Sequence, residues 1–64
     1  MYTMIERTSS LNADENGKAL QNVVIQVDTE ADLPTPEDSW EVGSYAILAN
    51  THRYKRLNSE REWV

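Results

Sequence analysis

Few residues of this 64-residue chain could do chemistry, because it has one histidine and no cysteine. Nucleophilic catalysis needs a hydroxyl or thiol beside a base that a third group orients, and only His52 could be that base. His52 stands between Thr51 and Arg53 in a segment with turn character. An exposed histidine beside a cation suits that position better than a catalytic one. A chain this short also offers little volume for a cleft, so we predict that the protein is not an enzyme.

Metal binding has one weak candidate in the sequence. Asp28, Glu30 and Asp32 alternate like the first ligands of a calcium loop. Leu33 and Ser39 stand where that loop needs glycine and glutamate. Without thiolates and with a single imidazole, the usual zinc sites are not available either. A solvated acidic loop is therefore the expectation, with no metal and no other cofactor.

Residues 52–56, His-Arg-Tyr-Lys-Arg, interleave an aromatic ring with basic side chains. This composition is found in weak contacts to single-stranded nucleic acid. The net charge of −5 disfavours a polyanion as a partner. The same pattern also suits an exposed edge strand that charge protects from aggregation. We therefore do not expect nucleic acid as a partner.

Acidic and basic side chains are concentrated in different parts of the chain. The acids of the middle segment are Asp28, Glu30, Asp32, Glu37, Asp38 and Glu41. The bases near the end are Arg53, Lys55, Arg56 and Arg61. Two solvated faces would explain this distribution. Head-to-tail assembly would too, and in that case Arg53, Lys55 and Arg56 make the electrostatic contact to an acidic neighbour.

The length allows one domain that needs help to be stable. A chain this short buries only about 60% of its unfolded surface. Disulfides and structural metals are not expected here, so oligomerisation or docking on a larger body is the expected help. A hydrophobic content of 39% is too high for simple disorder. No apolar run approaches the roughly 20 residues that cross a bilayer, and the start does not read as a signal peptide. We therefore expect no membrane partner and assembly in the cytoplasm.

Residues 1–28 predict an N-terminal hairpin. Residues 2–7 alternate loosely, and residues 22–28 form the clearest strand, with Val23, Ile25 and Val27 on one face. Asn16-Gly17 in the polar stretch between them is a strong turn dipeptide. We predict a loop over residues 9–17. The alternative is one helical turn capped by Asn12.

Residues 29–42 predict an acidic loop. Pro34 and Pro36 each remove a backbone donor and so exclude a strand. Thr35 followed by Pro36 is a favourable helix start. We therefore predict a short helical turn near residues 36–41, which Gly43 ends and which swings Trp40 inward.

Residues 43–64 predict a C-terminal meander. Residues 44–50 are apolar on both faces, which indicates a central strand or one that a partner covers. After a turn at residues 50–52, residues 53–57 return as a strand. A bulge near Lys55-Arg56 would place Tyr54 and Leu57 on one side. Residues 62–64 are expected to form a short closing strand, in the chain's own sheet or in a neighbour's.

The predicted fold is mainly β: one small antiparallel β-meander and hairpin module with one short helical turn. The side chains predicted to form its core or an interface are Trp40, Tyr45, Ile47, Tyr54, Leu57 and Trp63. Core tryptophans and interface anchors are both open, because a chain this small can share its core between subunits.

From residue 31 onward the sequence resembles a short β-meander module of bacteriophage virion proteins. The resemblance is carried by Leu33-Pro34, Gly43-Ser44-Tyr45, Tyr54 and the closing Glu62-Trp63-Val64. Asn50-Thr51-His52 replaces the usual glycine turn, and Ser44 stands where an acid is frequent. The resemblance implies a virion structural protein of a phage or prophage: a capsid decoration, head-fibre or tail-fibre base, or connector piece. It implies a homo-oligomer, or contacts with other virion proteins, and no small-molecule substrate. The alternative is a small acidic inhibitor or regulator of a host protein that mimics nucleic acid with the carboxylates of residues 28–41.

Overall fold

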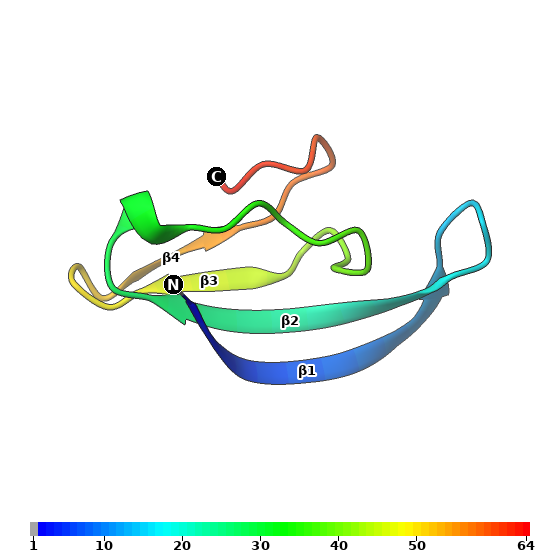
Figure 1. Cartoon of the computed structure of the whole chain (residues 1–64), viewed down its shortest axis with the longest axis horizontal. Helices are drawn as coiled ribbons and strands as arrows, with labels where there is room; N and C mark the ends of the chain where they lie inside the picture. Colours follow the sequence, from blue (N-terminus) through cyan, green and yellow to red (C-terminus); the bar gives the residue numbers. More distant parts are fainter. Residues whose placement is uncertain (1) are drawn as a thin grey trace.

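A single sheet organises the chain. The computed structural model describes residues 2–64, so Met1 of the predicted N-terminal hairpin lies outside the described residues. The sheet has four strands in the order β1-β2-β3-β4 (Figure 1). The strands are β1 (Tyr2–Ala13), β2 (Ala19–Val27), β3 (Tyr45–Leu48) and β4 (Arg53–Arg56), and the one helical element is the 3₁₀ helix η1 (Glu30–Asp32). The predicted mainly-β fold is confirmed.

Strands β1 and β2 form an antiparallel hairpin in which Tyr2 lies opposite Val27. The Asp14 carboxylate closes the turn by accepting the backbone N–H groups of Asn16 and Lys18, each at 2.9 Å. Gly17 has φ +79°, which only glycine adopts at little cost. The loop in the structure is shorter than the predicted residues 9–17, because β1 runs to Ala13. Residues 5–9 and 11–13 of β1 are exposed, so their side chains do not show the apolar alternation that marks a strand.

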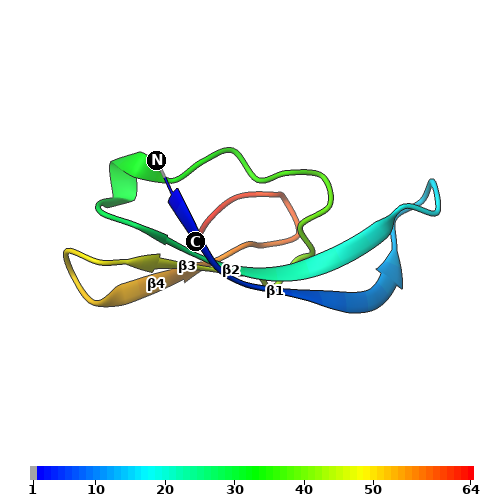
Figure 2. The same ribbon diagram turned by 60° about the horizontal axis from the view of Figure 1, so that its bottom comes forward.

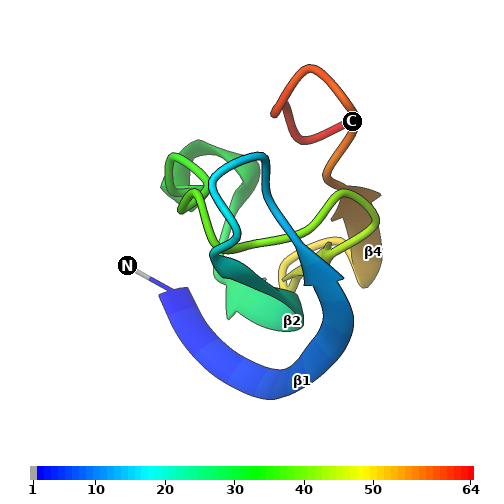
Figure 3. The same cartoon turned by 90° about the vertical axis from the view of Figure 1, so that its right-hand side faces the viewer.

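Two irregularities bend β1, one between Met4 and Glu6 and one between Ser9 and Ala13. Such bulges bend a strand and increase its twist. Figures 2 and 3 show the result: β1 curves, and the tip of the hairpin extends beyond the rest of the sheet.

The pairing of β2 with β3 is parallel, from Val24 opposite Tyr45 to Val27 opposite Leu48. The outer pairs are antiparallel, as predicted. A parallel pair needs a long crossover, and residues 28–44 provide it by crossing one side of the sheet (Figure 1). The molecule therefore consists of two antiparallel hairpins joined by a parallel pair instead of a continuous antiparallel meander.

The helical turn predicted near residues 36–41 is wrong. That segment holds only a turn in which the Trp40 N–H donates to the Glu37 carbonyl at 3.0 Å. Residues 39–41 are instead extended beside β2: Gln21 donates to the Ser39 carbonyl and accepts from the Glu41 N–H, both at 2.8 Å. This pairing satisfies backbone groups that a helix would have to satisfy internally. The helical turn lies earlier, at η1, where the Asp32 carboxylate accepts from the backbone and hydroxyl of Thr29.

The core lies on the side of the sheet that residues 28–44 and the C-terminal segment 57–64 cover; we call this side the inner face (Figure 1). Its buried cluster consists of Val23, Ile25, Trp40, Ala46 and Leu57, each at most 1% exposed. Tyr2, Met4, Leu33 and Trp63 pack against this cluster. The predicted burial of one face of β2 is confirmed, since Val23, Ile25 and Val27 are all buried.

Trp40 is the largest buried side chain. Its ring meets the Tyr2 ring edge-on at 5.6 Å and the Trp63 ring at 6.2 Å. Its indole N–H is buried without a hydrogen-bond partner among the described residues. Leaving such a donor unpaired costs about 1–3 kcal/mol. Trp40 is held here by packing, and the expected inward position of its ring is confirmed.

The C-terminal segment pairs within its own chain. Trp63 bridges Leu57, and the backbones of Arg56 and Val64 exchange two hydrogen bonds of 2.9 Å. The Trp63 indole donates to the Pro34 carbonyl at 2.9 Å. These bonds hold the segment both to the edge of β4 and to the crossover loop. No helix in residues 2–64 is long and apolar enough to cross a bilayer.

Ser44 joins three parts of the backbone from a buried position. Its hydroxyl donates to the Glu41 carbonyl at 2.8 Å and accepts from the Val23 N–H at 3.1 Å. Ser44→Ala would leave both backbone groups without this partner, so we expect a loss of about 1–3 kcal/mol in the free energy of unfolding. Urea unfolding monitored by circular dichroism measures it. The exposed Ser59→Ala is the matched control and should change stability by less than about 0.5 kcal/mol; an equal loss in both variants would contradict this role for Ser44.

Candidate functional site

The side of β3 and β4 opposite the covered one carries an apolar surface, which we call the outer face. The strand register places its residues in two cross-strand rows: Val24 with Tyr45 and Arg56, and Gln26 with Ile47 and Tyr54. Tyr54 is 64% exposed, and Tyr45 and Ile47 are half-buried. The two-sided apolar character of β3 is thereby explained, because one of its faces enters the core and the other is open.

Two tyrosines shape this outer face. The Tyr45 and Tyr54 rings meet edge-on at 5.2 Å with an interplanar angle of 82°. Together with Ile47 they line a shallow apolar depression of about 240 Å³. Tyrosine is an enriched residue at protein interfaces, because its rigid ring buries much area at a small entropic cost. The depression can accept one apolar side chain of a partner.

Arg56 borders the depression and fixes its tyrosine. Its guanidinium donates to the Tyr45 hydroxyl at 2.9 Å and lies 5.3 Å from the centre of the Tyr45 ring. The hydrogen bond to Tyr45 raises the pKa of Arg56, so the guanidinium is always cationic. Its other N–H groups can bind a carboxylate. An apolar depression next to a cation suits a partner segment that combines an apolar side chain with acidic ones.

The six predicted core or interface residues fall into two sets. Trp40 and Leu57 are in the core, and Trp63 packs against it. Tyr45, Ile47 and Tyr54 line the outer depression. The predicted bulge near Lys55-Arg56 is wrong, because β4 pairs regularly with β3 and places Tyr54 and Leu57 on opposite sides.

The three predicted basic contacts do not form one cluster. Strand alternation places Lys55 on the opposite side from Arg56, and Lys55 forms an ion pair with Glu30. Arg53 is exposed at the start of β4. Only Arg56 borders the outer depression.

Two of the carboxylates considered for metal binding contact other side chains, and the candidate catalytic base is exposed. Asp32 is bonded to Thr29 within η1, and Glu30 to Lys55. Within residues 2–64 no three histidine, cysteine or carboxylate side chains are arranged to hold a metal ion. His52 lies exposed in the turn between β3 and β4, as the sequence predicts, with φ 57°.

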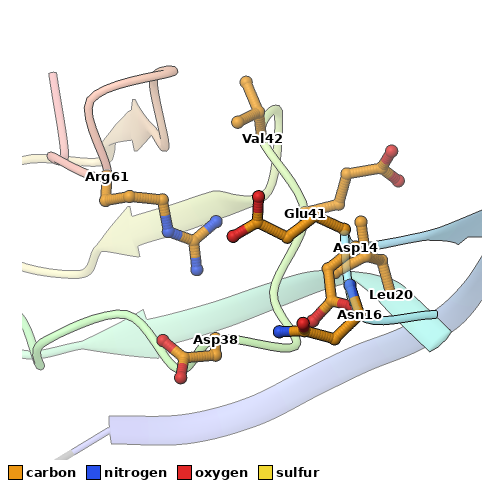
Figure 4. Close-up of a pocket in the computed structure, with 8 residues that line it drawn as sticks. Asp14, Asn16, Leu20, Asp38, Glu41, Val42 and Arg61 are labelled. Atoms are coloured by element: carbon orange, nitrogen blue, oxygen red, sulfur yellow. The ribbon is translucent and has the colours of Figure 1, made fainter. Parts of the chain in front are cut away.

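Sequence reasoning missed a second surface, at the tip of the first hairpin. Carboxylates of the hairpin turn and of the crossover loop gather there around a depression (Figure 4). These carboxylates are Asp14, Glu15, Asp38 and Glu41, and Arg61 also lines the depression. The Asn12 amide donates to the Glu41 carboxylate at 2.6 Å and so connects β1 to the crossover loop. Leu11, the one large apolar residue in the polar run of residues 9–17, precedes this turn in the sequence.

Comparison with known proteins assigns no relative: no protein-family model, no curated protein and no solved structure matches this chain.

Proposed function

We propose that this protein is a non-enzymatic structural protein that assembles with copies of itself and with other proteins through its outer face. The observation that carries the proposal is the depression lined by Tyr45, Ile47 and Tyr54, open to solvent and bordered by Arg56. Its residues lie on paired strands, so the surface is rigid before a partner binds. Pre-organisation of this kind lowers the entropic cost of association.

The resemblance of residues 31–64 to phage β-meander modules supports the virion as the setting. In that setting the protein would be a capsid decoration, fibre base or connector, partnered by further virion proteins. The closing tryptophan of the resemblance has a clear structural role, since Trp63 packs against Trp40 and bonds Pro34. The parallel pair β2–β3 departs from a plain meander. This difference concerns how the two hairpins are joined, and it does not change the outer face of the second hairpin.

Light scattering of the purified protein across micromolar concentrations tests self-assembly. A single chain has a mass of 7.4 kDa, and we expect a multiple of this mass for the unchanged protein. Tyr54→Glu places a charge in the apolar depression and should return the protein to the monomer. Tyr54 is 64% exposed, so this substitution leaves the core intact.

Ser59→Glu is the matched control for that experiment. Ser59 is exposed in the C-terminal segment, which covers the inner face, and it lines neither the outer depression nor the one at the hairpin tip. It introduces the same charge and should leave the assembled mass unchanged. A folded monomer of the unchanged protein at every concentration would refute self-assembly through the outer face.

One observation favours the second candidate, an inhibitor or regulator of a host protein. The crossover-loop carboxylates Asp38 and Glu41 lie with Asp14 and Glu15 around one depression. Such a cluster is suited to a basic partner surface. Under this alternative the protein works as a monomer, and Asp38→Asn with Glu41→Gln should abolish binding of the host protein while Tyr54→Glu leaves it intact.

A further inference from the structure

Leu11 is placed as an apolar knob at the tip of the first hairpin. Its side chain is 95% exposed, the highest exposure among the large apolar residues. Its φ of 66° lies in the left-handed region, which the Cβ atom of leucine disfavours. Glycine or asparagine would suit this backbone better. A leucine that is both strained and exposed contributes nothing to this fold that we can identify, which points to a role outside the chain.

The hairpin turn that follows Leu11 is acidic. Asp14 and Glu15 lie in this turn, where they line one depression with Asp38 and Glu41 of the crossover loop (Figure 4). Asn12, the residue after Leu11, donates to the Glu41 carboxylate. Two cations lie in this region, Lys18 and Arg61. The Arg61 guanidinium already donates to the carbonyls of Trp40 and Glu37. The tip therefore combines the exposed side chain of Leu11 with an excess of carboxylates.

This combination complements the outer face. The depression lined by Tyr45, Ile47 and Tyr54 is apolar and of a size to accept one side chain, and the charge that borders it is the cation Arg56. The tip and the depression lie far apart on a molecule 37 Å long, and Figure 1 shows the hairpin tip and the β3–β4 turn at opposite ends. The two surfaces cannot meet within one chain.

We propose that Leu11 of one copy inserts into the Tyr45–Ile47–Tyr54 depression of the next copy, with the tip carboxylates facing Arg56. This inference rests on the proposed function and names the partner surface. The contact is head-to-tail: each copy uses its tip on one side and its depression on the other. A contact of this type builds rings or open chains instead of closed dimers.

The test uses two variants that each lose one half of the contact. Leu11→Asn removes the knob and suits the left-handed backbone, so the variant should remain folded with an unchanged or slightly higher Tm. Tyr54→Glu places a charge in the depression but keeps Leu11. Loss of one buried leucine should weaken self-association about 10- to 100-fold, so each variant alone should be monomeric at concentrations at which the unchanged protein assembles.

Mixing the two variants in equal amounts is the decisive step. The intact Leu11 of the Tyr54→Glu chain can enter the intact depression of the Leu11→Asn chain, and no further contact can form. We expect a heterodimer of two chains and no larger species, measured by light scattering and by native mass spectrometry. Circular dichroism confirms that both variants are folded.

The outcomes separate this inference from the proposed function. If Leu11→Asn assembles like the unchanged protein while Tyr54→Glu does not, the outer face binds another occupant: this inference is overturned and the proposed function stands. If both variants are monomeric and their mixture is too, the contact is not head-to-tail and the inference is again overturned. If the unchanged protein is monomeric, both proposals fail.

Discussion

Leu57→Ala should remove most of the stability of this fold. Leu57 is 0% exposed at the centre of the core, and such a truncation costs about 2–5 kcal/mol. Its backbone donates to the Ser44 carbonyl and accepts from the Gly43 N–H, each at 2.9 Å, so the chain cannot easily move to fill the cavity. A core in a domain of this size rarely supplies more than about 3–5 kcal/mol. The substitution therefore removes most of the stability that is available.

Leu11→Ala is the matched control, because it makes the same chemical change at a side chain that is 95% exposed. It should change the free energy of unfolding by less than about 0.5 kcal/mol. Urea unfolding monitored by circular dichroism compares the two variants, at a protein concentration low enough to keep the chains monomeric. A Leu57→Ala variant as stable as Leu11→Ala would mean that the core described above does not hold the fold together.

Trp63→Ala should be the next most damaging change, with a loss of about 2–4 kcal/mol in the free energy of unfolding. A buried tryptophan truncation costs about 3–5 kcal/mol, and Trp63 is only half-buried. Its ring packs against Trp40 and its N–H bonds the Pro34 carbonyl. Removing it opens the crossover loop and the C-terminal segment together, because this side chain connects them.

Trp63→Phe separates packing from hydrogen bonding at this position. Phenylalanine keeps most of the ring contact and loses the bond to Pro34, so we expect a loss of only about 1 kcal/mol. The difference in urea midpoint between the alanine and phenylalanine variants measures the packing part. If both variants lose the same stability, the hydrogen bond matters more than the packing, contrary to this interpretation.

These stability changes bear on assembly as well. Self-association stabilises the folded chain by a free energy that rises with the logarithm of the partner concentration. The melting temperature of the unchanged protein should then rise with its concentration if the outer face binds a second copy. The core variants and the surface variants thus report on separate properties, since Leu57 and Trp63 lie on the inner face and Leu11 and Tyr54 do not.

Local sequence patterns predicted the strands whose two faces differ in solvent exposure. Alternating β-branched residues predicted the buried face of β2, and Asn16-Gly17 predicted a turn that the structure closes with Gly17 at positive φ. The apolar character of both faces of β3 predicted a central strand, and β3 lies between β2 and β4. In each case the information is held within a few neighbouring residues, so a pattern can reveal it.

The same patterns failed where a distant part of the chain decided the outcome. The helix start at Thr35-Pro36 is locally favourable, but the backbone around Trp40 pairs with Gln21 in β2 and stays extended. The bulge predicted in β4 would have placed Tyr54 beside Leu57. The register with β3 is regular, so Leu57 enters the core while Tyr54 lies on the outer face. Pairing energies between segments far apart in sequence leave no trace in the local composition.

By itself the sequence determined that this protein is a small, cysteine-free, mainly β domain. Length and composition are properties of the whole chain, and strand alternation is a local pattern, so none of them depends on the tertiary structure. Only the tertiary structure decided that β2 and β3 run parallel, that Tyr45 and Tyr54 meet on an open face, and that Arg56 joins them while Lys55 does not. It also brought the carboxylates of two distant segments together around one depression at the hairpin tip. The physical reason is that a side chain's neighbours across a sheet are set by register and crossover, and these are chosen by the free energy of the whole fold.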